Sequence, residues 1–276
     1  MPIITISRGS YSKGKEVAEK LAQALRYDCV SRDILLEASD EFNIPEIKLV
    51  RALHDAPSVL ERFTNGKERY LCYIRSAILN HVIKDNVVYH GLAGHYFLRS
   101  VPHVLKVRII GNIEARIQEE MTREKISEAE ARYILKKDDE ERRKWGLQVY
   151  GMDTWDSSLY DVVLHIGTIT VNDAVDILCA IVNKPGFQKT PASEKILKDL
   201  ALSAKVLSSL VNMVPKIDVK ANDGTVVIVT PGLLPNSTVN ELSTIAENVE
   251  GVTKVIISVP SSREQQGHIN PFHNIG

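Results

Sequence analysis

The first residues of chemical interest form a loop rich in glycine, serine and lysine close to the start of the chain. Gly9, Gly14 and Lys15 have the G-x-x-x-x-G-K spacing of a phosphate-binding loop. In such a loop the backbone amides point inward at an anion, and the positive end of the following helix adds to the attraction. We predict that this loop binds phosphate groups through Gly9, Ser10, Tyr11, Ser12, Lys13, Gly14, Lys15 and Glu16.

Glu16 departs from the general pattern of this loop. A serine or threonine that holds Mg²⁺ usually follows the lysine, and Glu16 stands there instead. Its carboxylate would repel phosphates unless it turns away or meets the metal. A glycine-rich turn with a structural role only is the alternative. The context favours phosphate binding, because the loop follows an apolar strand and opens an amphipathic helix. We expect ATP and Mg²⁺ as cofactors and predict no metal-ligating set of protein side chains.

A second group of candidate residues lies in a highly charged helical stretch at about 114–145. Such a run is usually a solvated helix face with ion pairs between residues four apart. Phosphoryl transfer offers a second interpretation, because it needs cations around the transferred group and a lid that excludes water. Arg116 and Arg123 share a helix face, and Asp139 and Arg142 can meet. The basic residues of the stretch are Arg116, Arg123, Lys125, Arg132, Lys136, Lys137, Arg142, Arg143 and Lys144.

The elements that would position these residues alternate between strands and helices. Apolar, β-prone segments are predicted as strands, and a helix with an apolar stripe follows the last of them at 171–182. Alternation of this kind indicates an α/β domain with a parallel sheet of five strands. Residues 32–84 read as a mostly helical insert. The predicted strands are 3–7, 27–30, 86–91, 103–111 and 161–167.

The composition changes near residues 185–193, where two prolines, a glycine and polar residues predict a linker. The residues beyond it predict a small α+β domain, 194–260, with the order helix–strand–strand–helix–strand. Asp223-Gly224 is the turn signal of its hairpin. We expect residues 261–276 to form a flexible tail.

Composition narrows the possible functions of the chain. The 276 residues carry 34 Lys+Arg against 35 Asp+Glu, a net charge of −1, so the chain is no strongly cationic nucleic-acid binder. No apolar run is long enough to cross a membrane. The N-terminus lacks the features of a signal peptide, and the three cysteines form no C-x-x-C pair. We therefore expect a cytoplasmic protein.

Four segments of residues 1–182 carry a resemblance to known proteins. They are ITISRGSYSKGKEVAEKLAQAL, SRDIL, REKISEAEARYILKKDDEERRKW and LYDVVLHIGT. Together they resemble the cytidylate kinase-like family of nucleoside monophosphate kinases. The resemblance implies a phosphate-loop kinase domain, residues 1–184, with an ATP site at Gly9–Glu16, an acceptor site under the helical insert and a lid formed by the charged stretch.

The resemblance also implies roles for individual residues. Ser31, Arg32 and Asp33 fall where the family begins its monophosphate pocket, and Gly91 lies at the acceptor side. Lys15, Arg123 and Arg142 would be the catalytic residues, the two arginines as lid residues that contact phosphates.

The acceptor side contains one departure from the family. Cytidylate kinases carry Gly-Arg-Asp after the third strand, and this chain has Gly91, Leu92 and Ala93. Leucine cannot replace a bidentate cation at a phosphate or a base. The identity of the acceptor is therefore open. His90 and His95 flank this position.

The C-terminal segment, about 194–259, resembles a BON domain through KIDVKANDGTVVIVTPG and AENVEGVTKVIISV. The resemblance implies a module that binds a phospholipid or a protein partner. Two functions follow for the whole chain. The first is ATP-dependent phosphoryl transfer to a nucleoside monophosphate or a similar small acceptor, either phosphorylated or hydroxylated. The second is a nucleotide-binding sensor that has lost turnover and engages a partner through its C-terminal domain.

Overall fold

The computed structural model describes residues 2–10, 12–31, 33–44, 66–91, 93–214 and 216–259. Its chain divides into two compact units, each made of two separate segments. The first unit contains Met1–Asp33 and Lys84–Thr190, and the second contains Ile34–Ile83 and Pro191–Gly276. Each unit is described by itself.

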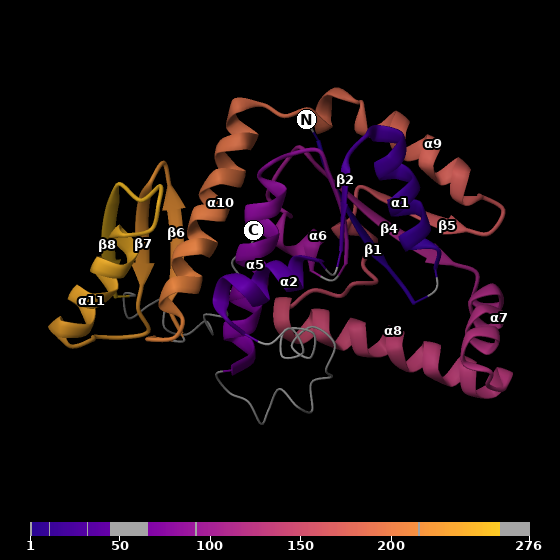
Figure 1. Cartoon of the computed structure of the whole chain (residues 1–276), viewed down its shortest axis with the longest axis horizontal. Helices are drawn as coiled ribbons and strands as arrows, with labels where there is room; N and C mark the ends of the chain where they lie inside the picture. Colours follow the sequence, from indigo (N-terminus) through magenta and orange to yellow (C-terminus); the bar gives the residue numbers. More distant parts are fainter. Residues whose placement is uncertain are drawn as a thin grey trace. The chain divides into compact units, whose positions relative to one another are not determined.

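A five-stranded sheet forms the centre of the first unit (Figure 1). The strand order is β2-β3-β1-β4-β5, and every neighbouring pair is parallel, which confirms the predicted α/β sheet. Because β1 lies between β3 and β4, the loop after β1 leaves the carboxyl edge at the centre of the sheet. The strands are β1 (Ile3–Arg8), β2 (Asp28–Val30), β3 (Val87–His90), β4 (Val104–Gly111) and β5 (Val162–Ile166).

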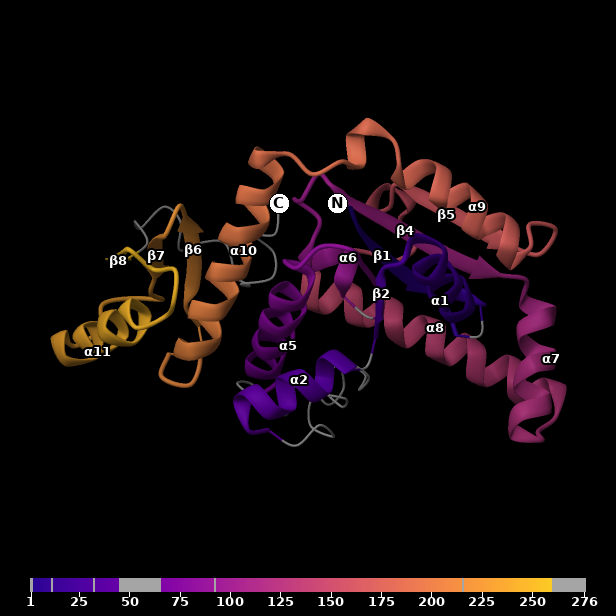
Figure 2. The ribbon, with the colours of Figure 1, turned by 45° about the horizontal axis from the view of Figure 1, so that its top comes forward.

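Alternating side chains of the central strands face two different layers. Ile4 and Ile6 of β1 share an apolar cluster with Leu21 of α1 (Gly14–Leu25) and Leu178 of α9 (Val171–Val182). Period-two alternation therefore places Thr5 on the opposite face, where α6 (Gly94–Phe97) contacts β1. In both views α1 and α9 lie on one side of the sheet and α8 (Glu128–Tyr150) runs along the other (Figures 1 and 2).

The charged stretch at 114–145 is two helices rather than one. The first, α7 (Ile113–Glu124), ends at Lys125 in the left-handed conformation, with φ of 56°. The second, α8, begins after Ser127, whose side chain accepts a hydrogen bond from the Glu130 amide while the Glu130 carboxylate accepts one from the Ser127 amide. This reciprocal cap satisfies amides that a helix start leaves unpaired, which explains the break in the helix.

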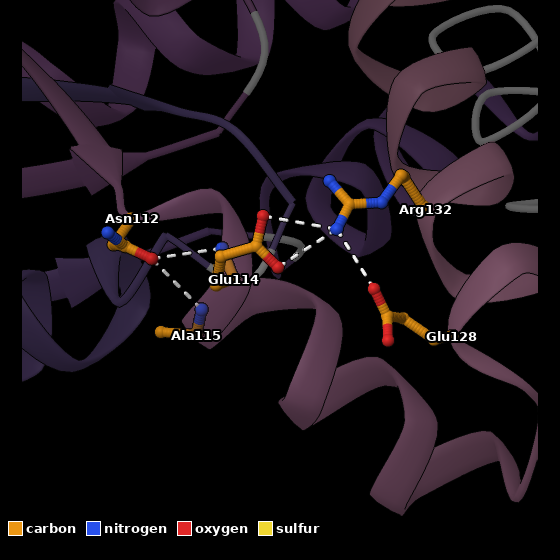
Figure 3. Close-up of polar contacts among 5 residues, drawn as sticks. All are labelled: Asn112, Glu114, Ala115, Glu128 and Arg132. Carbon is orange, nitrogen blue, oxygen red and sulfur yellow. Dashed lines mark hydrogen bonds and ion pairs between the residues drawn. The ribbon is translucent and has the colours of Figure 1, made fainter.

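One arginine of the charged stretch ties the two helices together (Figure 3). Arg132 of α8 donates to the Glu114 carboxylate of α7 at 2.9 Å and to Glu128, one turn earlier, at 3.0 Å. Asn112 caps α7 by accepting hydrogen bonds from the amides of Glu114 and Ala115. Arg132 therefore forms surface ion pairs, as is usual for a basic residue in a charged helical run.

The second unit combines the predicted helical insert with the C-terminal segment. Helix α5 (Gly66–Val82) of the insert contacts α10 (Pro191–Leu210). Phe42, at the end of α2 (Asp33–Phe42), stacks on Tyr73 of α5 with ring centroids 4.2 Å apart. Residues 45–65 of the predicted insert lie outside the described residues.

The C-terminal segment has the predicted helix–strand–strand–helix–strand order. Its sheet has the order β6-β7-β8, with β6 antiparallel and β8 parallel to the central β7. Asp223 and Gly224 both have positive φ, 53° and 78°, as the predicted two-residue hairpin requires. Figure 2 shows α10 beside β6. The elements after α10 are β6 (Asp218–Asn222), β7 (Thr225–Val229), α11 (Asn236–Glu247) and β8 (Lys254–Ser258).

The predicted linker, 185–193, contains a short 3₁₀ helix, Pro185–Phe187, and the first turn of α10. The insert groups with the C-terminal segment rather than with the phosphate-loop part of the chain. The boundaries 1–184 and 194–260 stay predictions, and the tail 261–276 lies outside the described residues. Among the described helices, none combines the length and the apolar composition needed to cross a membrane.

Candidate nucleotide-binding site

The predicted phosphate loop connects the end of β1 to the start of α1 and folds back on itself. The Ser12 hydroxyl donates to the Gly9 carbonyl at 3.0 Å. A Cβ atom on Gly14 would lie 2.7 Å from Cβ of Arg8, so only glycine lets the helix start this close to the strand end. Lys13 precedes α1 in the left-handed conformation, with φ of 65°. Tyr11 lies outside the described residues.

Lys15 and Glu16 occupy the first turn of α1 and make contacts along the helix. The Lys15 ammonium is 3.6 Å from the Glu19 carboxylate, and its side chain is 65% exposed. An exposed pair of this kind holds a lysine weakly, so Lys15 is free to turn toward a phosphate. The Glu16 carboxylate is 3.2 Å from the Lys20 ammonium. Glu16 therefore turns along the helix, which is one of the two arrangements that make it compatible with a bound phosphate.

Two arginines from the charged helices reach the backbone beside the loop. Arg116 of α7 is buried and donates from Nε to the Ser10 carbonyl at 2.6 Å. Arg142 of α8 donates to the Arg8 carbonyl at 3.0 Å, and burial lowers the pKa of its guanidinium. These bonds place two cations at the carboxyl end of β1. Arg142 therefore lies next to the loop, and its contact with phosphate stays a prediction.

Arg123, the other predicted lid arginine, lies at the C-terminal end of α7. Its side chain is 60% exposed, and its guanidinium is 2.7 Å from the carboxylate of the neighbouring Glu124. Arg116 is the arginine of α7 that bonds to the Ser10 carbonyl, at the other end of the shared helix face. Sequence spacing placed both arginines on one face but could not say which end of that face meets the loop.

Carboxylates of α7 and α8 also lie against the loop. The Ser10 hydroxyl donates to Asp138 at 3.2 Å, and Arg116 donates to Asp139 at 2.8 Å. A Cβ atom on Gly9 would lie 3.3 Å from Oδ1 of Asp139. The Lys13 ammonium is 2.8 Å from the Glu119 carboxylate. No group of three or more metal-ligating side chains occurs among the described residues.

The strand end beside the loop carries His90, a buried side chain whose Nδ1 has no hydrogen-bond partner among the described residues. Burial, assisted by the charge of Arg8, lowers the pKa of His90 to about 4. The charges of Lys15, Glu19 and Asp33 also act on this imidazole. Lys15 and Glu19 of α1 and residue Asp33 therefore lie near the end of β3.

The residues predicted to bind the acceptor lie near this strand end or outside the described residues. Ser31 is half-buried, and Asp33 is the exposed first residue of α2. A Cβ atom on Gly91 would lie 2.6 Å from the Tyr89 hydroxyl, so Gly91 allows a close approach. Ala93 is buried in the left-handed conformation before α6. Arg32 and Leu92 lie outside the described residues.

One polar cluster of this unit has no counterpart among the predicted site residues. It contains Ser7, His95, Arg108 and Tyr160, which hydrogen bonds and ring contacts connect. An arginine in a strand otherwise rich in Val, Leu and Ile was the available signal, because β4 alternates apolar side chains with Lys106 and Arg108.

Comparison with solved structures returns chains of similar fold. An uncharacterized protein from Eubacterium ventriosum ATCC 27560 matches with a TM-score of 0.50 and 21% identity, over 67% of this chain and 99% of its own. Shikimate kinase from Bacteroides thetaiotaomicron has a TM-score of 0.42 and 12% identity, over 66% and 99%. Dephospho-CoA kinase from Campylobacter jejuni has a TM-score of 0.37 and 17% identity, over 65% and 96%. At these identities the likeness concerns the fold alone.

A search of curated proteins returns no match. The model of the cytidylate kinase-like family matches residues 3–168, which span the sheet, the phosphate loop and the two charged helices. The match covers more than half of the sequence and includes both Lys15 and Arg142. The chain therefore belongs to the cytidylate kinase-like family.

Proposed function

We propose that the chain is an ATP-dependent kinase that transfers a phosphoryl group to a nucleoside monophosphate or a similar small acceptor. The observation that carries this proposal is the set of cations around the loop. Arg116 and Arg142 bond to backbone carbonyls beside it, and Lys15 follows it with an exposed ammonium. Phosphoryl transfer depends on positioning and on neutralising negative charge, and this arrangement is suited to both.

In this proposal, one group of residues binds ATP and another neutralises the charge of the transferred phosphoryl group. The loop amides and the start of α1 would bind the phosphates of ATP, and Lys15 would turn toward the β- and γ-phosphates. Arg116 and Arg142 would neutralise the charge that develops during transfer. A nucleoside monophosphate needs no general base, because its phosphate is already an anionic nucleophile.

The residues beside the loop also fit Mg²⁺. The ion prefers oxygen ligands and usually reaches such sites with the phosphates of its nucleotide. Asp138 and Asp139 present carboxylate oxygens beside Ser10 and Gly9, and Glu16 lies one position after Lys15. Asp138 and Asp139 are the residues that would hold the ion, directly or through water, and it would supply charge neutralisation.

Replacing Lys15 tests the proposed site. Lys15→Ala should weaken ATP binding by about 1–3 kcal/mol, because a charge-assisted hydrogen bond to phosphate is lost. Calorimetry measures the affinity, and coupled ADP release with each of the common nucleoside monophosphates measures transfer. Lys184→Ala, which removes an exposed lysine just after α9, should leave both unchanged. Unaltered ATP affinity in Lys15→Ala would remove the loop from the nucleotide site.

A nucleotide-binding sensor is the second candidate. It is favoured by Ala93, which stands where a cytidylate kinase carries aspartate, at a helix start without a side-chain cap. In this case ATP would bind without transfer to any acceptor, and the nucleotide would change how residues 194–260 engage a protein or phospholipid partner. Tight ATP binding with no ADP release across a broad acceptor panel would support the sensor over the kinase.

A further inference from the structure

The polar cluster of Ser7, His95, Arg108 and Tyr160, here called the Arg108 cluster, lies near the carboxyl end of the two central strands. Ser7 of β1 and Arg108 of β4 are direct partners in the sheet register. Arg108 Nη1 is 3.4 Å from the Ser7 hydroxyl and 3.3 Å from the Tyr160 hydroxyl. The Tyr160 hydroxyl is 3.3 Å from Nε2 of His95 and 3.0 Å from the Thr154 carbonyl.

Every hydrogen-bond partner of Arg108 among the described residues is a neutral group. Tyr160 has one hydroxyl proton, and the Thr154 carbonyl can only accept, so that proton points to Thr154. Tyr160 then accepts from Arg108 and His95. Burial and the charge of Arg108 lower the pKa of His95 to about 3, so the imidazole is neutral near pH 7. The cluster therefore holds one positive charge and no negative one.

The acidic groups around the cluster have other partners. Asp153, whose carboxylate feels the charge of Arg108, accepts from Arg143 Nε and Nη2 at 2.9 and 2.7 Å. Asp139 accepts from Arg116 at 2.8 Å, and Asp138 accepts from Ser10. Arg108 is thus a half-buried guanidinium without a carboxylate bound to it in the part of the chain that the structure describes.

The neighbouring arginines raise the free-energy cost of a positive charge on Arg108. The charges of both Arg108 and Arg116 lower the pKa of Arg142, against the opposite effect of Asp138 and Asp139. Arg108 and Arg116 therefore each lie close enough to Arg142 for their positive charges to repel it. A cation in this setting is stabilised by a bound anion, because a partly buried charge needs an opposite charge or several strong hydrogen bonds.

The unused donors of Arg108 show what kind of anion would fit. Nη1 makes both of its recorded bonds, and Nε and Nη2 have none among the described residues. A guanidinium with free donors on one side matches two oxygens of a phosphate or a carboxylate. We propose that Arg108 binds an oxyanion of the acceptor, a phosphate monoester or a carboxylate, with the hydroxyls of Ser7 and Tyr160 beside it.

This inference rests on the proposed kinase function and names the residue that recognises the acceptor. Arg108 would act at the acceptor, whereas Lys15 acts at ATP. The two sites therefore make separate predictions. Loss of Arg108 should affect anion binding and leave nucleotide binding at the loop intact.

The test uses the full chain saturated with ADP and titrated calorimetrically with three probes. The first is a set of nucleoside monophosphates (CMP, UMP, AMP and GMP), the second is inorganic phosphate, and the third is the hydroxycarboxylate gluconate. At least one probe should bind the wild-type chain. Arg108→Met should lower the affinity for that probe by about tenfold or more, the range for loss of a charge-assisted hydrogen bond. The ADP affinity should change less than about twofold on the same scale.

Two further variants separate a lost contact from a lost fold. Arg108→Lys keeps the positive charge but lacks the two parallel N–H donors of a guanidinium, so it should bind the probe with intermediate affinity. Tyr160→Phe keeps the ring, whose centroid lies 5.5 Å from the Arg108 guanidinium. This variant should lower the affinity for the probe less than Arg108→Met does. Arg99→Met, which removes an exposed arginine, should bind like the wild-type chain.

The outcomes distinguish the two proposals. Binding of a monophosphate or inorganic phosphate identifies a phosphate site, and binding of gluconate alone identifies a carboxylate site. A wild-type chain that binds ADP but none of the three probes overturns the assignment of Arg108. So does a folded Arg108→Met chain that binds its probe with wild-type affinity. A chain that does not bind ADP at all refutes the proposed function instead.

Discussion

Two buried histidines link the stability of the first unit to pH. Burial lowers the pKa of His90 to about 4 and that of His95 to about 3, against an ordinary value of 6.5. At a pH between the lowered pKa and 6.5, the unfolded chain binds more protons than the folded one. The free energy of unfolding should therefore fall as the pH falls below 6.5. The decrease should reach about 1.4 kcal/mol per pH unit for each histidine, as urea denaturation at about pH 7 and about pH 5.5 would measure.

The pH dependence, rather than the stability at one pH, is the quantity to compare between variants. His90→Gln and His95→Gln should each remove one histidine's share of the decrease, and the double variant should remove both. A double variant with the pH dependence of the wild-type chain would show that folding does not lower the pKa of either imidazole.

At the scale of elements, the C-terminal half of α8 packs closely against Tyr96 of α6 and the residues that follow α8, and this packing requires a glycine at position 146. A Cβ atom on Gly146 would contact the Tyr96 hydroxyl and would lie 2.9 Å from both the Met152 carbonyl and Cγ2 of Thr154. We expect Gly146→Ala to lower the free energy of unfolding by about 1–3 kcal/mol through overpacking, despite the higher helix propensity of alanine. Urea denaturation measures the change.

Two controls test the cause of that change. Gly186→Ala should be nearly neutral, because nothing lies within 4 Å of its Cβ position. Adding Tyr96→Phe to Gly146→Ala removes the hydroxyl in closest contact and should recover part of the loss. If Gly146→Ala were as stable as the wild-type chain, the tight packing between α8 and Tyr96 would be wrong.

On the scale of the whole molecule, the insert and the C-terminal segment share one compact unit. Asn212, just after α10, accepts hydrogen bonds from Tyr73 at 3.1 Å and Arg69 at 3.2 Å, both on α5. A chain that stops at Thr190 lacks α10 and leaves α5 without this partner. We expect residues 66–82 to become sensitive to protease in the truncated chain, while ATP binding at the loop persists, as limited proteolysis and calorimetry would show.

Asn212→Ala in the full chain is the matched variant. It removes only the hydrogen bonds to α5 and should lower the free energy of unfolding by about 1–2 kcal/mol without exposing α5 to protease. If α5 stayed protected in the truncated chain, the insert would fold without the C-terminal segment, and the predicted boundary at residue 184 would gain support.

Local patterns in the sequence are enough to place the loop and the elements around it. The G-x-x-x-x-G-K spacing, the alternation of apolar strands with helices and the Asp223-Gly224 turn each depend on residues close together in the chain. Such features are set by backbone geometry and by the period of the apolar residues, which a sequence displays directly. The parallel sheet and the order of elements in the C-terminal segment were predictable for this reason.

Contacts between distant residues needed the folded chain. Arg116 and Arg123 lie on the same helix, and only the fold shows that Arg116 is the one that bonds to the Ser10 carbonyl. Arg108 meets Ser7 and Tyr160 through strand register, and α5 meets α10 across a long stretch of sequence. Helical or strand periodicity says which face a residue lies on, but the partner of that face depends on how the elements assemble.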